Sequence, residues 1–403
     1  MGKPKTIDPL VIVGGGPAGL KTAIEALKRG FEKEIVIFEE DEWIGRPPHC
    51  AGLVSVRCLK EFSPKIPSKI IVNRIKGARV FFANSGELII SKKGYVAYVL
   101  DREELDSYLA NQAVKAGANI VRNAKVTNIE GGDKGKVLLS NGAIYRFSVA
   151  IIATGAREEL ASKLGFGQFK GKLPALQWEM EKIKDLDPDL VEIYLGTKFS
   201  KGLFAWIIPL SDDKARVGVA TAKNPLLRLE YMTKKEPLTS YRFSGAKITK
   251  VYGGIVITLG GGRRLVKDNV AIIGDVAGQT KPTTGGGLYY IDIASKALGK
   301  ALSKGRLDAY SKDWWRKMRS ELRLQLTLRL FLNKIRDDDL ATIYRILKDI
   351  DFEYKASSKG DMDFQSNLLK DIMLKDSRRA LRHPRLIYYM FSSFIRAALC
   401  PSL

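Results

Sequence analysis

The sequence predicts a fold that is part α/β and part α+β, built on a Rossmann-like dinucleotide-binding domain that is split along the chain. Residues 10–39 have the pattern of a strand, a glycine loop, a helix and a second strand that ends at an acidic residue. Residues 270–288 repeat the strand and the glycine-rich turn before a helix. The segments between these two units are rich in β-type alternation, which predicts an inserted antiparallel sheet.

The first unit begins with the apolar run Leu10–Val13, and the loop Gly14–Gly19 then fits the pattern G-x-G-x-x-G. A helical pattern and a second apolar run follow and end at Glu39, about 20 residues past the loop, as a dinucleotide site requires. Gly14 would permit the sharp turn, Gly16 would let a pyrophosphate approach the backbone, and Gly19 would let the helix pack closely. Glu39 could accept hydrogen bonds from ribose hydroxyls. An ordinary βαβ unit is the alternative, and the motif does not separate FAD from NAD.

Composition narrows the class of protein. The chain has 403 residues with 45% hydrophobic character, which is enough for two or three globular domains. Three cysteines argue against a disulfide scaffold, and two histidines exclude a His-rich metal site, so we expect no metal. The net charge of +23 has three readings, which are nucleic acid, an anionic membrane surface and a solubility trait of the source organism. The charge is spread along the chain, which disfavours nucleic acid, and we expect an anionic membrane surface as the partner. No apolar run approaches the roughly 20 residues that span a bilayer.

A loop follows the first unit, and it places His49 and Cys50 side by side before the small pair Ala51-Gly52. Cys50 is either a small buried residue or a thiol that faces a reaction site and donates a proton or hydrogen bond there. The same two readings apply to His49.

The middle of the chain alternates between strands and one clear helix. Residues 70–99 predict strands of a separate sheet, and a helix capped by Asp101 is expected to run to Ala116. A later strand, Ser148–Ile152, runs into small residues, as if the backbone lay near a cofactor. Residues 160–265 are again β-rich, with an aromatic piece at Gly202–Pro209.

The second glycine module favours FAD over NAD. A buried strand ends in Gly274-Asp275, and Pro282–Leu288 then opens a helix. Asp275 could bind a ribityl hydroxyl, and the glycines would let backbone N–H groups reach the edge of a flavin ring. Dehydrogenases that use only NAD lack such a module.

The last part of the chain, residues 306–403, is helical and basic in pattern. Residues 376–396 hold five arginines and one aspartate among aromatic and aliphatic residues. Such a helix suits either a membrane interface or packing against the body of the protein.

Together these motifs resemble the geranylgeranyl reductase family, within the p-hydroxybenzoate-hydroxylase-like FAD superfamily. The loop Gly14–Gly19 with Glu39 matches the ADP-binding module, and Pro48–Gly52 resembles the family's P-x-x-C-[AG]-G segment. Phe204–Pro209 resembles the Y-x-W-x-F-P motif that lines the lipid cavity, with Phe204 and Ile208 as departures. Thr154–Arg157 stands where hydroxylases carry an Asp-Gly fingerprint, which weakens a monooxygenase reading.

The resemblance implies a division of the chain and a set of site residues. The FAD-binding domain would comprise residues 1–69, 98–160 and 266–305, the lipid-cavity domain residues 70–97 and 161–265, and the helical region residues 306–403. Its implied cofactor contacts are Gly14, Gly16, Pro17, Ala18, Gly19, Glu39, Glu40, Arg46, Cys50, Ala51, Gly52, Arg102, Val126, Gly155, Gly274, Asp275, Pro282, Gly285, Gly286, Gly287 and Leu288. Phe204, Trp206 and Pro209 would contact substrate, and Cys50 and His49 are the candidate catalytic residues.

The implied activity is reduction of C=C bonds in geranylgeranyl chains of archaeal ether lipids, with FAD as cofactor. Reduced flavin would deliver hydride from N5, and a proton would reach the other alkene carbon. The alternatives are a flavin monooxygenase and an electron-transfer flavoprotein at the membrane. No second nucleotide module is visible, so the electron donor stays open between reduced ferredoxin and NAD(P)H. We expect a cytoplasmic monomer that associates peripherally with the membrane and does not bind nucleic acid.

Overall fold

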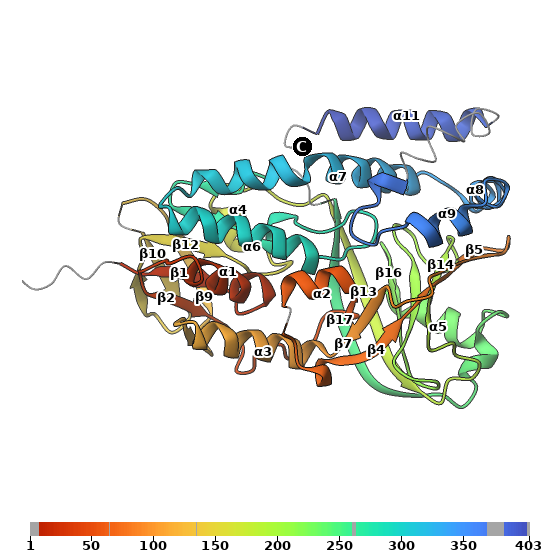
Figure 1. Cartoon of the computed structure of the whole chain (residues 1–403), viewed down its shortest axis with the longest axis horizontal. Coiled ribbons are helices and arrows are strands. Elements are labelled where there is room, and N and C mark those ends of the chain that lie inside the picture. Colours follow the sequence, from red (N-terminus) through yellow and green to blue (C-terminus); the bar gives the residue numbers. More distant parts are fainter. Residues whose placement is uncertain (1–7, 64, 134, 260–262, 369–382, 401–403) are drawn as a thin grey trace, which may run out of the picture.

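The computed structural model describes residues 8–63, 65–133, 135–259, 263–368 and 383–400. Figure 1 shows a helix-covered sheet on one side, a larger sheet on the other, and a layer of C-terminal helices along one edge. The predicted fold class, a Rossmann-like sheet with an inserted antiparallel sheet and a helical end, is confirmed.

A six-stranded sheet carries both glycine modules. Its order is β18-β19-β12-β1-β2-β8, and its strands are parallel except for the edge pair β18 and β19. The central strands β1 and β2 are buried at every position, which explains why they are continuous apolar runs. The strands are β1 (Leu10–Val13), β2 (Ile35–Phe38), β8 (Asn119–Val121), β12 (Val149–Ile152), β18 (Val266–Lys267) and β19 (Val270–Ile272).

Helices pack on this sheet and against one another. α1 (Pro17–Leu27) contacts both α6 (Leu288–Ser303) and α3 (Arg102–Lys115). The Asp101 side chain accepts a hydrogen bond from the backbone N–H of Glu104, which confirms the predicted cap. Two shorter helices are α2 (Val56–Phe62) and α4 (Glu159–Lys163).

A seven-stranded sheet forms the second half, in the order β17-β13-β16-β15-β14-β5-β6. All neighbours are antiparallel except β14 and β5. Alternate residues of β15 face opposite sides, so Ile207 packs with α5 (Pro225–Lys234) and Trp206 packs toward the first half. The strands are β5 (Gly77–Phe82), β6 (Glu87–Ser91), β13 (Gly171–Glu181), β14 (Leu190–Leu195), β15 (Ala205–Pro209), β16 (Ala215–Ala220) and β17 (Lys247–Leu259).

Two three-stranded sheets complete the β structure. β7 (Ala97–Leu100) pairs with both β3 (Leu53–Ser55) and β4 (Ile71–Ile75), so β4 lies outside the seven-stranded sheet that its neighbours β5 and β6 join. The other sheet is the meander β9 (Val126–Glu130), β10 (Lys136–Leu139) and β11 (Ile144–Arg146). The domain boundaries stay a prediction.

The C-terminal helices lie along one edge of the molecule (Figure 1). α7 (Asp308–Leu332) packs on α6, and α11 (Pro384–Ala398) packs on α7, while α8 (Asp337–Asp349) and α9 (Phe352–Lys359) contact the edge of the seven-stranded sheet. The predicted basic segment 376–396 is described only from residue 383, and residues 376–382 lie outside the described part of the chain. Among the described residues, no helix has both the length and the apolar character needed to cross a membrane.

Candidate cofactor and reaction site

The three motif glycines of the first loop have three different surroundings. A Cβ on Gly14, whose φ is +109°, would lie 2.5 Å from the carbonyl oxygen of Ala153 on the neighbouring strand turn. A Cβ on Gly19 would lie 2.1 Å from the carbonyl oxygen of Gly14, so α1 packs directly on the loop. A Cβ on Gly16 would meet nothing within 4 Å. Gly14 and Gly19 are therefore required by packing, whereas Gly16 leaves open space at the helix N-terminus, the position at which loops of this pattern hold a phosphate.

Glu39 ends β2 beside this loop. Its carboxylate accepts hydrogen bonds from the backbone N–H of Gly15 at 2.6 Å and from that of Asp41 at 3.0 Å. These bonds hold the carboxylate against the glycine loop, at the position expected for a group that binds ribose. Glu40 instead pairs with Arg157 and, at 3.4 Å, with Lys125.

The second glycine module packs against the first. A Cβ on Gly274, whose φ is +80°, would lie 2.8 Å from the Cβ of Ala18 at the start of α1. A Cβ on Gly287 would lie 3.1 Å from a carboxylate oxygen of Asp275. The close approach of these segments brings Asp275 and the turn Pro282–Gly287, which we call the ring-edge turn, to the same end of the sheet as the first loop.

Asp275 is a partly buried carboxylate that accepts no hydrogen bond from the described residues. Burial raises its pKa from the usual 3.8 to about 6, against the opposing charge of Arg102. The pKa of Asp275 is higher in the folded state than in the unfolded state, so between about pH 4 and pH 6 the folded protein binds more protons at this carboxyl than the unfolded chain does. The carboxyl therefore contributes stability at low pH that is lost as the pH rises through about 6.

An Asp275→Asn variant is expected to be more stable than the wild type above pH 6 when both proteins are stripped of flavin, by up to about 3 kcal/mol. The difference should shrink toward pH 4, since the wild-type carboxyl is then protonated. Urea unfolding across this pH range measures it, and a difference that does not change with pH would contradict the assignment.

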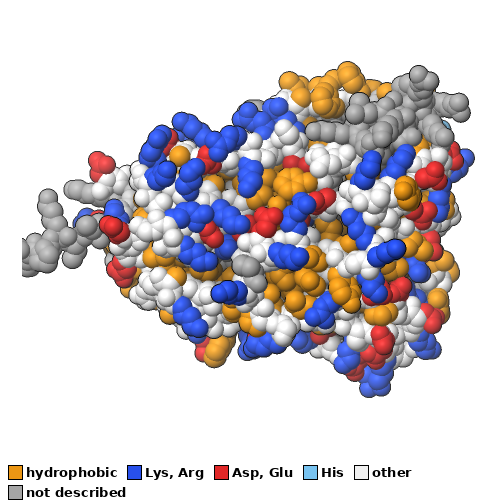
Figure 2. Space-filling view, viewed as in Figure 1, with side chains coloured by type: hydrophobic (Ala, Val, Ile, Leu, Met, Phe, Trp, Pro, Cys, Tyr) orange, Lys and Arg blue, Asp and Glu red, His pale blue; other side chains and the backbone are white. Residues whose placement is uncertain are grey.

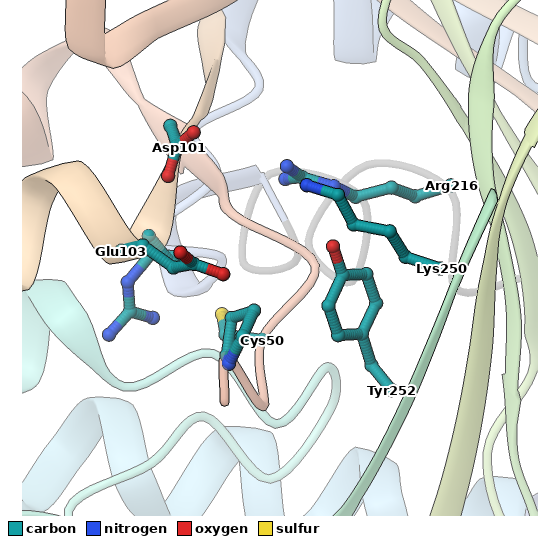
Figure 3. A pocket seen from close by; sticks show the side chains of 8 residues that line it. Cys50, Asp101, Glu103, Arg216, Lys250 and Tyr252 are labelled. Carbon is teal, nitrogen blue, oxygen red and sulfur yellow. The ribbon is translucent and has the colours of Figure 1, made fainter. Parts of the chain in front are cut away.

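The loop that carries Cys50 faces the beginning of α3. Figure 3 shows Cys50 opposite Arg216, Lys250 and Tyr252 across a recess, with Asp101 and Glu103 on the helix side. The Cys50 side chain is exposed, and its sulfur accepts a hydrogen bond from the backbone N–H of Gly52 at 3.4 Å. Cys50 therefore belongs to a polar recess between the two halves of the molecule.

Arg102 forms the inner wall of this recess. It binds both carboxylate oxygens of Asp106 at 3.1 Å, while its Nε is buried without a hydrogen-bond partner. Burial alone would lower the pKa of Arg102, but Asp106 and the neighbouring Cys50 more than offset that effect and raise it. Arg102 is therefore a permanent cation with one donor free for a ligand.

Other residues of the loop that carries Cys50 are held by contacts with β17 and α3. His49 Nδ1 lies 2.7 Å from the carbonyl oxygen of Gly253 on β17, and Arg46 donates to Glu103 at 2.9 Å. A Cβ on Gly285 would lie 2.2 Å from a side-chain carbon of Val256, also on β17. The Cys50 loop and the ring-edge turn thus meet the same stretch of one strand, which brings together the two segments expected to face the flavin ring.

The structure adds a cluster of charged and phenolic groups that the sequence analysis missed. Arg216 on β16 donates to the carbonyl oxygens of Ala51 and Leu100, each at 2.9 Å, and contacts Glu179 at 3.4 Å. Tyr252 donates to the same carboxylate at 3.4 Å, and burial followed by the charge of Glu179 raises the Tyr252 pKa to about 12. The available signal was a lone arginine in the otherwise apolar strand β16, which is buried throughout.

Arg329 on α7 was also missed. Its guanidinium is buried and donates to the carbonyl oxygens of Pro282 at 2.9 Å, Thr283 at 2.7 Å and Gly202 at 2.7 Å. Burial lowers its pKa to about 10, and it forms no ion pair with a described carboxylate. One side chain therefore ties the ring-edge turn to the loop before β15.

A second tie to the ring-edge turn comes from the segment after α9. Lys281 binds Asp363 at 2.6 Å and donates to the carbonyl oxygen of Met362 at 2.9 Å. The other carboxylate oxygen of Asp363 accepts from the hydroxyl of Ser55, next to the Cys50 loop. The C-terminal region thus helps to position both segments of the site.

The face of the seven-stranded sheet that looks toward the site is apolar. Trp206 and Ile208 are buried there, and Phe204 lies edge-on to Trp206 with ring centroids 6.2 Å apart. The Trp206 Nε1 donates to Gln177 at 2.9 Å, and its ring lies over Gly218, where a Cβ would be 2.4 Å away. Pro209 is buried at the end of the strand. This wall meets the site at Ala51, the neighbour of Cys50, which packs against the same cluster.

The residues present fit an extended dinucleotide such as FAD. The open helix N-terminus at Gly16, the free carboxylate of Asp275 and the unpartnered Nε of Arg102 are the polar groups that such a ligand would satisfy. Val126 is buried at the start of β9, and Gly155 has φ +61° at the turn after β12, with nothing within 4 Å of an added Cβ. The individual contacts to a cofactor stay predictions.

Known proteins resemble the chain along most of its length. The family model described as lycopene cyclase protein matches residues 9–354. An uncharacterised protein of Methanocaldococcus jannaschii is 31% identical over 369 residues, which cover 89% of this chain and 93% of that protein. Digeranylgeranylglycerophospholipid reductase 2 of Methanothermobacter thermautotrophicus is 28% identical, with 84% of this chain and 91% of that protein covered.

The fold is also similar to a solved structure. A geranylgeranyl bacteriochlorophyll reductase-like protein from Thermoplasma acidophilum superposes with a TM-score of 0.79 at 22% identity, over 94% of this chain and 98% of that one. At this identity the comparison supports the shared architecture.

Proposed function

Given that this chain belongs to the lycopene cyclase protein family, we propose that it is a reductase that saturates the C=C bonds of geranylgeranyl chains in archaeal ether lipids. The resemblance to geranylgeranyl reductases that the motifs indicated is confirmed, because relatives along most of the chain carry the name digeranylgeranylglycerophospholipid reductase. The chain is an FAD-dependent oxidoreductase that acts on CH–CH groups. The substrate and mechanism are the proposal.

The observation that carries the substrate assignment is the meeting of a polar recess with an apolar wall at Cys50. Cys50 lines the recess with Arg102, whereas the adjacent Ala51 packs against the cluster that contains Trp206. An isoprenoid chain can lie along the apolar wall because burying its methyl groups is favourable there. Such a chain would bring one double bond at a time to the thiol.

The chemistry that FAD would supply at this site, once bound and reduced, is a hydride for one alkene carbon. The other carbon needs a proton, and an unactivated alkene is a poor hydride acceptor, so we expect protonation to lead or accompany the transfer. Cys50 is the candidate to hold that proton at its sulfur, and Arg102, which lines the same recess, would orient the thiol. His49, bound to the Gly253 carbonyl, would position the loop or return the proton.

The function is tested with purified protein that is chemically reduced under anaerobic conditions and mixed with a geranylgeranyl phospholipid. Mass gains of hydrogen pairs support the reductase. Hydroxylated lipid formed with oxygen and NAD(P)H would indicate a monooxygenase, and unchanged lipid with a flavin that still cycles would indicate electron transfer. The electron donor, reduced ferredoxin or NAD(P)H, and the monomeric state stay predictions.

A Cys50→Ala variant is expected to lose about 10²- to 10⁴-fold in turnover, the range typical of a lost acid catalyst. Flavin content and flavin absorbance should stay at wild-type values, since the thiol side chain is exposed. Cys400→Ala is the matched control, and it should turn over normally. Full turnover by the Cys50 variant would remove this residue from the mechanism.

A further inference from the structure

The outward face of α11 is apolar over its whole length. Large hydrophobic side chains recur at helical spacing on this face, and none of the residues between them on the same face is charged. A patch of this size on a surface helix marks an interaction site. We call it the α11 face, and it consists of Tyr388 (67% exposed), Phe391 (61%), Phe394 (61%), Ile395 (40%) and Leu399 (73%).

The opposite face of α11 packs against the rest of the protein, so the apolar α11 face points toward solvent. Leu386, Ser393 and Ala397 are buried, and α11 packs along α7. Lys334 donates to the hydroxyl of Ser392 at 2.6 Å, and Arg385 pairs with Asp339 on α8. Both sides of the buried face are therefore fixed by polar contacts.

Exposed cations lie on the two helices of this edge, α7 and α11. Lys317, Arg319 and Arg323 on α7 are exposed, and none of them pairs with a carboxylate among the described residues. Arg396 on α11 is likewise exposed and unpaired within the described chain. Figure 2 shows hydrophobic side chains along the upper edge, where α11 lies in Figure 1, with blue side chains next to them. An exposed apolar helix face on an edge that also carries free cations is the pattern of a surface that lies in the interface of an anionic bilayer.

We propose that the α11 face and the cations of α7 dock this protein onto an anionic lipid bilayer. The inference rests on the proposed function, because a lipid substrate resides in such a bilayer. A second copy of the chain fits less well as the occupant, since pairing two α11 faces would bring together like charges of two molecules that each carry +23. The helix α7 packs against α11 and also carries Arg329, which binds the ring-edge turn. The proposed docking surface is therefore next to the elements that position the site.

The test is cosedimentation of the full chain with vesicles of phosphatidylcholine, with or without phosphatidylglycerol. Wild-type protein should bind the anionic vesicles, and a Phe391→Ser/Phe394→Ser variant should bind them at least about tenfold more weakly. A Lys317→Glu/Arg319→Glu variant should lose the preference for phosphatidylglycerol. The matched control is Leu226→Ser/Leu227→Ser on α5, where both leucines are exposed, and it should bind like the wild type.

Further measurements distinguish failure of the docking proposal from failure of the proposed function. Near-ultraviolet circular dichroism and flavin content confirm that each variant is folded. Wild-type protein that reduces detergent-dispersed lipid but ignores vesicles would overturn the docking proposal alone. Protein that binds vesicles through α11 but reduces no lipid would overturn the proposed function alone. Light scattering measures the oligomeric state of each variant. If the wild type is a dimer and the Phe391→Ser/Phe394→Ser variant is a monomer, the α11 face binds a second copy and the bilayer proposal is overturned.

Discussion

A Gly16→Val variant is expected to fold with wild-type stability and to be purified without flavin. A Cβ at this position meets nothing within 4 Å, and the φ of −77° and ψ of 179° are open to any residue. The added isopropyl group would, however, occupy the space at the N-terminus of α1 where the pyrophosphate must approach the backbone. We expect the affinity for FAD to fall at least about a hundredfold, because several phosphate hydrogen bonds are lost together.

Flavin absorbance of the purified protein and titration of the stripped protein with FAD measure this effect, and thermal unfolding of the stripped proteins measures stability. Gly94→Val is the control, since Gly94 also has open space and lies far along the chain from the loop. Gly19→Val should behave differently and lose stability, because its Cβ would collide with the Gly14 carbonyl. A Gly16 variant that keeps its flavin would show that the cofactor lies elsewhere.

Replacing Arg329 by methionine is expected to produce a large loss of stability. The variant would leave the buried carbonyl oxygens of Pro282, Thr283 and Gly202 without their donor. Each unsatisfied buried acceptor costs about 1–3 kcal/mol, and relief of the desolvated charge offsets part of the sum. We expect a net loss of about 2–4 kcal/mol, together with weaker flavin binding, because the ring-edge turn loses its support.

Urea unfolding of the stripped protein and FAD titration check this expectation separately. Arg323→Met is the matched control on the same helix, since Arg323 is exposed, and it should change neither quantity. Arg329→Lys should recover only part of the stability, because one ammonium cannot reach three carbonyls in the geometry of a guanidinium. Wild-type stability in the methionine variant would mean that the turn is held by Lys281 and Asp363 instead.

Some elements were predictable because their physics is local. The loop Gly14–Gly19 needs glycine where it lies too close to another backbone segment to admit a Cβ. Gly14 and Gly19 are such positions in the structure. Apolar runs such as Leu10–Val13 are strands buried on both faces, and a capping aspartate such as Asp101 marks a helix start. These signals need no knowledge of the rest of the chain.

Other elements were missed because a residue in their local sequence argues against the structure that they adopt. The long strand β13 contains Pro174, which argues against a central strand, yet it pairs on both sides with β16 and β17. The segment Gln177–Glu181 does alternate polar and apolar residues, but the strand escaped prediction because Pro174 interrupts the pattern just before it. Its pairing partners, distant in the chain, override this local preference.

The sequence by itself determined the fold class, the two glycine modules and the thiol at Cys50, because each depends on residue types at fixed short spacings. Only the tertiary structure decided that Arg216 and Tyr252, which both contact Glu179, stand opposite that thiol, and that Arg329 holds the ring-edge turn. Likewise, only packing shows which face of α11 is outward. A polar side chain in a strand or helix acquires its role from whichever distant backbone it meets, and that meeting is set by the packing of the whole chain rather than by its neighbours in sequence.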